Sequence, residues 1–315
     1  TVDRFRLNVT TSGRFTMSQS TDTPNGFPNS LKLDCTTADT SIAADEQIRL
    51  NYRIEGQDLQ QIKKGTSDAE KVTLSFYAKV VGSATKISVQ LKDNDNSRSV
   101  AKLFTLTTSW ARYTYTFPAD TTGALDNDNA SSLLINFYLH AGSNFTSGTL
   151  ATTWESNTNA NLAVGLDTSF VSSTDNEFFL TGVQLEVGSQ ATPFEHRSFG
   201  EELRLCQRYF VLLANGNTNV ICEGSAYNTN QANGVVTFPV EMRAVPSVEQ
   251  TSGTNYYTYI SNATNHTFDE FEGISGLNTR CTVLYKHNVG SLTAASAGWI
   301  QSFNSSAFTA LKAEL

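Results

Sequence analysis

Alternation of apolar and polar residues is the feature that most constrains the fold of this chain. Between residues 71 and 80, apolar side chains occupy every second position, including Val72, Leu74, Phe76 and Ala78. A period of two is the period of a β-strand, and it places these side chains on one buried face. Further strands are predicted at 87–91, 110–117, 133–139 and 178–186.

The composition agrees with strands and disagrees with helices. Thr, Ser and Asn make up 98 of 315 residues, and these residue types form helices poorly. Hydrophobic residues reach 39% and aromatic residues 10%, which is enough for a folded core and excludes a disordered chain. Asn- and Asp-rich clusters at 93–96 and 126–129 mark turns between strands. We therefore predict an all-β chain that begins with an antiparallel β-sandwich or jelly roll.

The strand pattern breaks near residue 198 and then resumes. Thr192-Pro193-Phe194 ends the first series, and 199–213 is the clearest helical stretch. Strands are predicted again at 235–240, 281–285 and 307–315. We predict three parts. They are a jelly-roll domain at 1–198, a short helical linker at 199–213 and a smaller β-sandwich domain at 214–315.

The helical stretch carries a short heptad pattern. Leu203, Cys206, Phe210 and Leu213 are separated by three, four and three residues, the a/d spacing of a coiled coil. Two heptads are fewer than a coiled coil needs. The pattern therefore leaves two interpretations: an amphipathic turn that packs on its own domain, or a short parallel bundle in an oligomer.

Charge, hydropathy and cysteine content limit the kinds of partner that this chain can bind and indicate the state of its thiols. The net charge of −8 argues against binding to a nucleic-acid backbone, which needs clustered Lys and Arg. No apolar run approaches the ~18 residues that would cross a bilayer, so we expect no membrane insertion. The four cysteines form no CxxC pair, and we expect free thiols. The first residue is Thr1, so we expect a further segment upstream.

Motifs of catalysis are not found. The four histidines show no zinc-ligand spacing, and the sequence contains no GxSxG and no phosphate-binding loop. A glycosidase needs two carboxylates placed across a cleft. Asp269, Glu270 and Glu272 are adjacent in sequence, which favours a solvated surface instead. We predict that the chain is not an enzyme.

Two kinds of binding residue are predicted. Asp126 and Asp128 offer oxygen ligands at short spacing, which suits a structural Ca²⁺. Their spacing does not match that of a twelve-residue calcium loop. No other cofactor is expected. Aromatic rings near polar loops could stack on sugars, with core packing as the alternative role for each ring. The tyrosine run is the best exposed candidate, because consecutive rings in a strand point to both faces. The candidate sugar-binding residues are Trp110, Tyr113, Trp154, Tyr256, Tyr257 and Tyr259.

The junction between the predicted domains resembles a known family. Residues 181–197 read TGVQLEVGSQATPFEHR, and residues 200–210 read GEELRLCQRYF. Both runs are similar to the junction in tail-fibre and related virion proteins of bacteriophages, especially marine ones. The resemblance implies a carbohydrate-binding-module-like jelly roll followed by a C-terminal β domain. It also implies that Glu195, His196 and Arg197 have an architectural role between the domains.

We therefore expect a non-enzymatic virion fibre protein that displays β domains to recognise a host-surface glycan. A homotrimer would convert weak glycan contacts into avidity. We expect it on the virion exterior, as a tail or head fibre in contact with other virion proteins. The alternatives are a head-fibre, decoration or adaptor protein that binds only virion proteins, and a carbohydrate-binding module.

Overall fold

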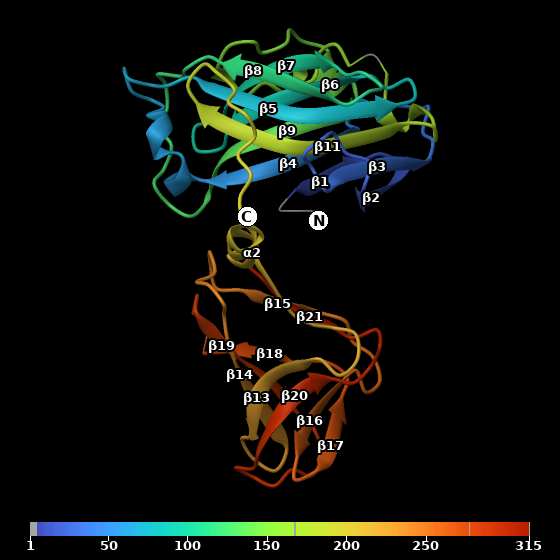
Figure 1. Ribbon diagram of the computed structural model, residues 1–315, viewed down its shortest axis with the longest axis vertical. Coiled ribbons are helices and arrows are strands. Elements are labelled where there is room, and N and C mark those ends of the chain that lie inside the picture. Colours follow the sequence, from blue (N-terminus) through green and yellow to red (C-terminus); the bar gives the residue numbers. More distant parts are fainter. Residues whose placement is uncertain (1–4, 167, 277, 315) are drawn as a thin grey trace. The chain divides into compact units, whose positions relative to one another are not determined.

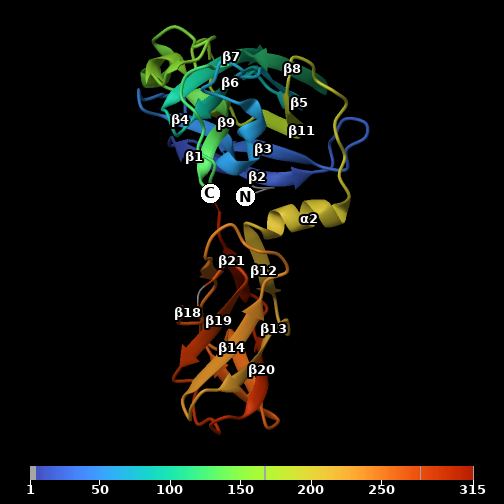
Figure 2. The same ribbon diagram turned by 90° about the vertical axis from the view of Figure 1, so that its left-hand side faces the viewer.

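The computed structural model describes residues 5–166, 168–276 and 278–314 (Figures 1 and 2). The chain divides into two compact units, residues 1–196 and 197–315. Every strand pairing described within the two units is antiparallel, which confirms the predicted all-β fold class with a jelly-roll first domain. None of the helices in the described part of the chain has the length and hydropathy of a membrane-spanning segment.

The first unit consists of a six-stranded and a five-stranded sheet with short helical turns in the connections (Figure 1). The six-stranded sheet has the order β1 (Arg6–Thr10), β4 (Gln47–Glu55), β9 (Ser131–Ala141), β6 (Lys86–Asp93), β7 (Arg98–Thr105) and β10 (Glu155–Ser156). The five-stranded sheet has the order β2 (Arg14–Ser20), β3 (Ser30–Thr37), β11 (Glu177–Val187), β5 (Val72–Val81) and β8 (Ala111–Phe117). The turns are η1 (Gly56–Asp58), η2 (Gln60–Ile62), α1 (Ser143–Thr146), η3 (Asn159–Asn161) and η4 (Phe170–Ser172).

The core of the first unit lies between these two sheets. Leu74 and Phe76 from β5 are fully buried, as are Leu50 from β4 and Phe137 from β9. The rings of Phe76 and Phe137 meet edge to face, with centroids 5.4 Å apart, which is a favoured aromatic geometry. The apolar face predicted from the alternation at 71–80 is therefore the inner face of the five-stranded sheet.

The second unit begins with helix α2 (Phe199–Gln207), and Figure 2 shows its strands. A three-stranded sheet has the order β12 (Phe210–Asn215), β21 (Phe308–Lys312) and β15 (Ser247–Gln250). A seven-stranded sheet has the order β17 (Thr264–Phe268), β16 (Tyr257–Ser261), β20 (Ala297–Ser302), β13 (Val220–Ala226), β14 (Gln231–Thr237), β19 (Cys281–His287) and β18 (Gly273–Ser275). The core of this unit has its own set of buried residues, including Leu284 and Leu311.

Helix α2 ends at Gln207, so the prediction of helix as far as residue 213 is wrong. Phe210 and Leu213 lie on strand β12, which pairs with β21. Leu203 is 43% exposed on the helix and Cys206 is half-buried there. The four residues of the heptad pattern therefore do not form one continuous helical stripe. Pairing with a strand a hundred residues away outweighs local helix propensity at Phe210.

Candidate ligand-binding face

Two of the predicted sugar-binding tyrosines are in the core, so their assignment to the surface is wrong. Tyr257 and Tyr259 are fully buried in β16, whereas Tyr256, directly before this strand, is half-buried. The Tyr257 hydroxyl donates to the carbonyl of Thr251, and the Tyr259 hydroxyl donates to that of Ser296 at 2.6 Å. Residues two apart on a strand share a face, and here that face packs against the core of the second unit.

The three aromatic residues of the first unit that were predicted to bind sugar each pack against a different part of that unit. Tyr113 stacks on Phe76 in the core, with ring centroids 5.6 Å apart. Trp154 packs against the same core, and its indole N–H donates to the Pro118 carbonyl at 2.8 Å. Trp110 lies over the outer side of the five-stranded sheet, against Phe179. The structure therefore does not bring these rings together as one sugar-binding platform.

The predicted calcium ligands are engaged in turns. The backbone N–H of Asp126 donates to Asp95 Oδ2 at 3.0 Å, and Asp128 Oδ1 accepts from the N–H of Ala130 at 2.9 Å. Both aspartates are exposed. Within the described residues, no three His, Cys, Asp or Glu side chains gather as a metal site. Calcium at Asp126 and Asp128 stays a prediction.

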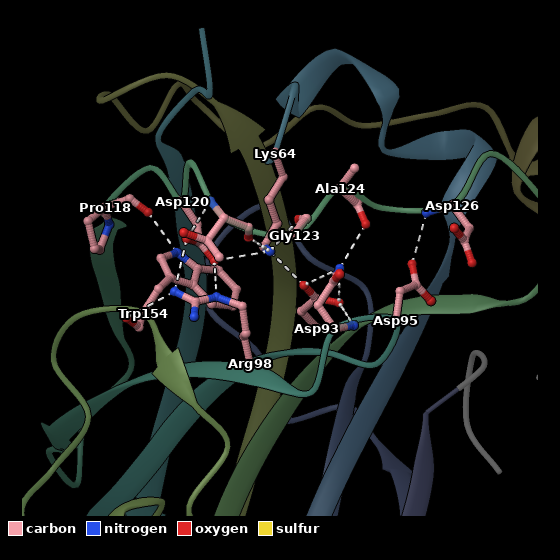
Figure 3. Close-up of polar contacts among 12 residues, drawn as sticks. Lys64, Asp93, Asp95, Arg98, Pro118, Asp120, Gly123, Ala124, Asp126 and Trp154 are labelled. Carbon is pink, nitrogen blue, oxygen red and sulfur yellow. Dashed lines mark hydrogen bonds and ion pairs between the residues drawn. The ribbon is translucent and has the colours of Figure 1, made fainter. Parts of the chain in front are cut away.

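An oxygen-rich cage lies close to this turn, and a lysine ammonium fills it (Figure 3). Lys64 Nζ lies 2.5 Å from Asp93 Oδ2 and 3.0 Å from Asp120 Oδ2. It also donates to the carbonyls of Thr122 and Gly123, both at 2.9 Å. Arg98 adds two hydrogen bonds to Asp120, at 2.7 and 3.1 Å.

The cage is internal and structural. The side chains of Lys64, Asp93 and Asp120 are at most 5% exposed. Burial by itself would raise the pKa of Asp120, but hydrogen bonds from Arg98 and Lys64 hold that pKa below its usual value. The Lys64 ammonium also lies 5.1 Å from the centre of the Trp154 ring. The charged groups therefore neutralise one another and stabilise the fold.

The three residues predicted to lie between the domains have partners within their own units. The backbone N–H of Glu195 donates to Gln184 Oε1 at 2.8 Å, and the His196 ring lies 5.2 Å from that of Phe27. Arg197 Nη1 pairs with Glu202 Oε1 at 3.0 Å on helix α2. Glu195 and His196 thus belong to the first unit and Arg197 to the second.

Part of the outer side of the six-stranded sheet is polar, and Leu134 and Tyr138 lie on the same side. On β4, Ile48 and Leu50 are fully buried in the core, so alternation turns Arg49, Asn51 and Arg53 to the other side of the sheet. The same argument applies to the neighbouring strands of this sheet. We call the following residues the polar face: Arg6, Arg49, Asn51, Arg53, Gln90, Lys92 and Asn136.

Strand register aligns four members of the polar face in one row across four strands. Arg6 on β1 lies opposite Asn51 on β4. Asn51 lies opposite Asn136 on β9, which in turn lies opposite Gln90 on β6. The amide of Asn136 donates to Gln90 Oε1 at 2.9 Å. Directly paired side chains stand about 5 Å apart on the same side, so the row is a continuous line of hydrogen-bonding groups.

Several polar atoms in this row are buried and unpaired. Asn51, Gln90 and Asn136 are fully buried although they lie on the outer side of the sheet. Among the described residues, Oδ1 of Asn51, Oδ1 of Asn136 and Nε of Arg53 have no hydrogen-bond partner. An unsatisfied buried polar group costs about 1–3 kcal/mol and is rare in native proteins. Gln90 Nε2 donates to Asn157 Oδ1 at 3.2 Å, so the segment that carries Asn157 covers the β6 end of the row.

The cations of the polar face are close enough to influence one another. Burial lowers the pKa of Arg53, and the charges of Arg6 and Arg49 lower it further. Burial likewise lowers the pKa of Lys92, and the charges of Arg49 and Arg53 lower it further. Arg49 is held in place, because its Nη1 donates to the Tyr138 hydroxyl at 3.3 Å. The face therefore combines neutral amides with a concentration of positive charge.

Sequence reasoning missed the polar face. The signal that could have found it was the polar set of alternating positions in the predicted strands, such as Asn136 between Ile135 and Phe137. A fully buried strand more commonly carries apolar residues at both sets of positions. Asn136 and Gln90 are distant in sequence, so only the strand order makes them neighbours.

Comparisons with known proteins give structural similarity only. No protein-family model matches the sequence, and no curated protein matches it. Among solved structures, the enzymatically active domain of tailspike protein 4 from bacteriophage CBA120 is similar at 12% identity and a TM-score of 0.34. That match covers 59% of this chain and only 20% of the tailspike chain.

Two carbohydrate-binding modules have similarly low identities and TM-scores. The family 11 module from Clostridium thermocellum, solved with a beta-1,3-1,4-mixed-linked tetrasaccharide, has 14% identity and a TM-score of 0.33, over 60% of this chain and 91% of its own. The CBM22-1 xylan-binding domain from Paenibacillus barcinonensis has 12% identity and a TM-score of 0.29, over 59% and 87%. Scores this low do not assign a ligand or a site to this chain.

Proposed function

We propose that this chain is a non-enzymatic fibre protein of a bacteriophage virion whose first unit binds a host-surface glycan at the polar face. The fibre role follows the resemblance of residues 181–210 to the domain junction of phage fibre proteins. The protein would lie on the virion exterior, in contact with other virion proteins.

The observation that carries glycan binding is the buried row of amides with unpaired oxygens. Sugar hydroxyls act as both donors and acceptors, and Asn and Gln side chains offer both functions in a single planar group. Asn51 and Asn136 each have a buried, unpaired Oδ1 on the outer side of the sheet, and a sugar hydroxyl that reached either atom would supply the missing donor. A few convergent polar groups of this kind fix the orientation of a small ligand.

The proposal is tested by measuring binding of the whole chain to an array of bacterial surface glycans. Asn136→Leu keeps the branched outline of the side chain and removes its hydrogen bonds, so it should abolish binding of the recognised glycan. Gln90→Met is a second variant of the same row, and a cooperative thermal unfolding transition in each variant would show that the first unit is still folded. Asn25→Leu is the matched control, because Asn25 is exposed in the loop between β2 and β3 of the other sheet.

Loss of binding in both row variants, with binding retained in Asn25→Leu, would support the proposal. No binding of any glycan by the unmodified chain would refute it, as would unchanged binding after both row substitutions. We further propose a homotrimer, in which three sites raise the effective concentration of later contacts. Light scattering should give three times the chain mass, and a monomer at micromolar concentration would contradict the trimer.

A further inference from the structure

The structure carries an inference about the chemistry of the glycan. We infer that the ligand of the polar face is acidic, and that Arg49, Arg53 and Lys92 bind its negatively charged substituents. This inference rests on the proposed function, because it names the class of glycan that the same face binds.

The charge of the polar face is opposite to that of the whole chain. The chain has a net charge of −8, yet four of the seven residues that define the polar face are Arg or Lys. None of the ion pairs that the structure describes involves Arg6, Arg49, Arg53 or Lys92. By contrast, Lys64 and Arg98 in the same unit both pair with the carboxylate of Asp120. The face is therefore a local excess of positive charge.

The cations surround the row of amides. Arg49 and Arg53 flank Asn51 on strand β4, two residues to either side of it. Four residues of strand span roughly 13 Å, so the two guanidinium groups have separate places along the sheet. Lys92 lies opposite Leu134, which lies opposite Arg53, so Lys92 is two strands, or about 10 Å, from Arg53.

This spacing suits an extended ligand with repeated charges. Arg49, Arg53 and Lys92 are half-buried, so a chain of sugars laid over the face would place its acidic groups against them directly. A compact anion such as free phosphate could reach one cation and would leave the others unused.

Partial burial makes the unpaired cations costly until an anion arrives. Arg53 and Lys92 are both half-buried, and each lies within the repulsive field of its neighbours. Removing water from a charge without a partner is unfavourable, and an opposite charge with hydrogen bonds offsets that cost. The nearest acidic residue along β4, Glu55, accepts a hydrogen bond from Gln57 at 2.6 Å.

The guanidinium geometry favours carboxylate or sulfate oxygens. Arg presents several N–H donors in a planar fork that can hold two oxygens of one anionic group. Nε of Arg53 is buried and has no described partner, so an anion that reached this edge of the fork would satisfy the donor. Arg49 is already oriented by the hydroxyl and the ring of Tyr138, which reduces the entropy lost when it binds.

The test compares probes that differ only in charge. Calorimetry of the whole chain would use polygalacturonate against carboxyl-reduced polygalacturonate, and dextran sulfate against dextran. The first pair reports carboxylates and the second reports sulfate esters. We expect at least tenfold tighter binding of an acidic probe than of its neutral counterpart. We also expect affinity to fall as salt rises from about 0.05 M to about 0.5 M.

Substitutions test whether the cations of the polar face cause the preference for acidic probes. Arg53→Gln and Lys92→Gln should each weaken binding of the acidic probe about tenfold or more. Arg14→Gln and Lys71→Gln are matched controls, because both side chains are exposed on or beside the five-stranded sheet. The controls make the same charge change and should leave the affinity within about twofold.

The outcomes separate this inference from the proposed function. Equal binding of neutral and acidic probes, lost in Asn136→Leu, would overturn the inference and leave glycan binding intact. A change in oligomer mass in Arg53→Gln or Lys92→Gln would also overturn it, because the face would then be an interface between copies of the chain. Binding of an acidic probe that survives both charge substitutions would overturn it as well.

Discussion

Replacing Lys64 by Met should destabilise the first unit strongly. The Lys64 ammonium contacts two buried carboxylates and two backbone carbonyls, and its side chain is 3% exposed. Met has a similar length and no charge, so the substitution leaves Asp93 and Asp120 in the interior without this cation. Breaking a buried ion pair from one side costs about 3–5 kcal/mol.

The remaining partners place the expected loss near the lower end of that range. Arg98 still donates twice to Asp120, and the backbone N–H of Asn96 still donates to Asp93 Oδ1 at 3.0 Å. We therefore expect a loss of about 3 kcal/mol in the free energy of unfolding. For a unit of this size, that loss corresponds to a decrease of about 6–12 °C in melting temperature.

Urea unfolding of the whole chain measures this loss, with Lys63→Met as the control. Lys63 is the adjacent residue, its side chain is 52% exposed, and its ion pair with Glu70 is 3.6 Å long. An exposed pair contributes about 0–1 kcal/mol, so the control should stay within that range. A loss below about 1 kcal/mol in Lys64→Met, equal to that of the control, would refute the argument that the buried cage stabilises the fold.

Three further predictions concern pH, helix capping and buried side chains. Burial lowers the pKa of His140 below 6.5, so the unfolded chain takes up that proton first. The free energy of unfolding of the first unit should then fall as pH drops below about 6.5, and His140→Gln should remove that decrease in urea titrations. Ser198→Ala removes the hydroxyl that accepts from the Glu201 N–H in the capping box of helix α2, while the bond from the Ser198 N–H to Glu201 remains. The substitution should cost about 1 kcal/mol, measured as faster hydrogen exchange in that helix; unchanged exchange would contradict it. Burial raises the pKa of Cys222 to about 12, so a thiol reagent at neutral pH should modify Cys222 only after unfolding, as mass spectrometry of digested protein can show.

Local alternation predicted several strands of the first unit well, whereas the segment predicted at 235–240 overlaps β14, Gln231–Thr237, only at its end. The segment predicted at 71–80 is strand β5, Val72–Val81, and its alternating apolar residues are buried in the core. The segments predicted at 133–139 and 178–186 lie within β9 and β11. Alternation succeeds because a sheet with one buried face repeats every two residues, whatever the order of its strands.

Pairing between strands that are distant in sequence decided the positions of residues that local sequence patterns predicted wrongly. Phe210 continues an apparent heptad, but its strand is held by pairing with β21 near the C-terminus. Tyr257 and Tyr259 lie in a polar stretch of sequence, but β16 pairs on both sides, with β17 and β20, and both rings turn inward. Local propensity contributes less to stability than burial does in each case.

The sequence by itself determined the all-β class, five strands of the first unit and the start of the helix at residue 199, because these depend on neighbouring residues. Only the tertiary structure decided where the polar face lies. Asn51, Asn136 and Gln90 come from three strands, and the order β4, β9, β6 makes them one row. The cations beside that row share the face because side chains at alternate positions of paired strands point the same way.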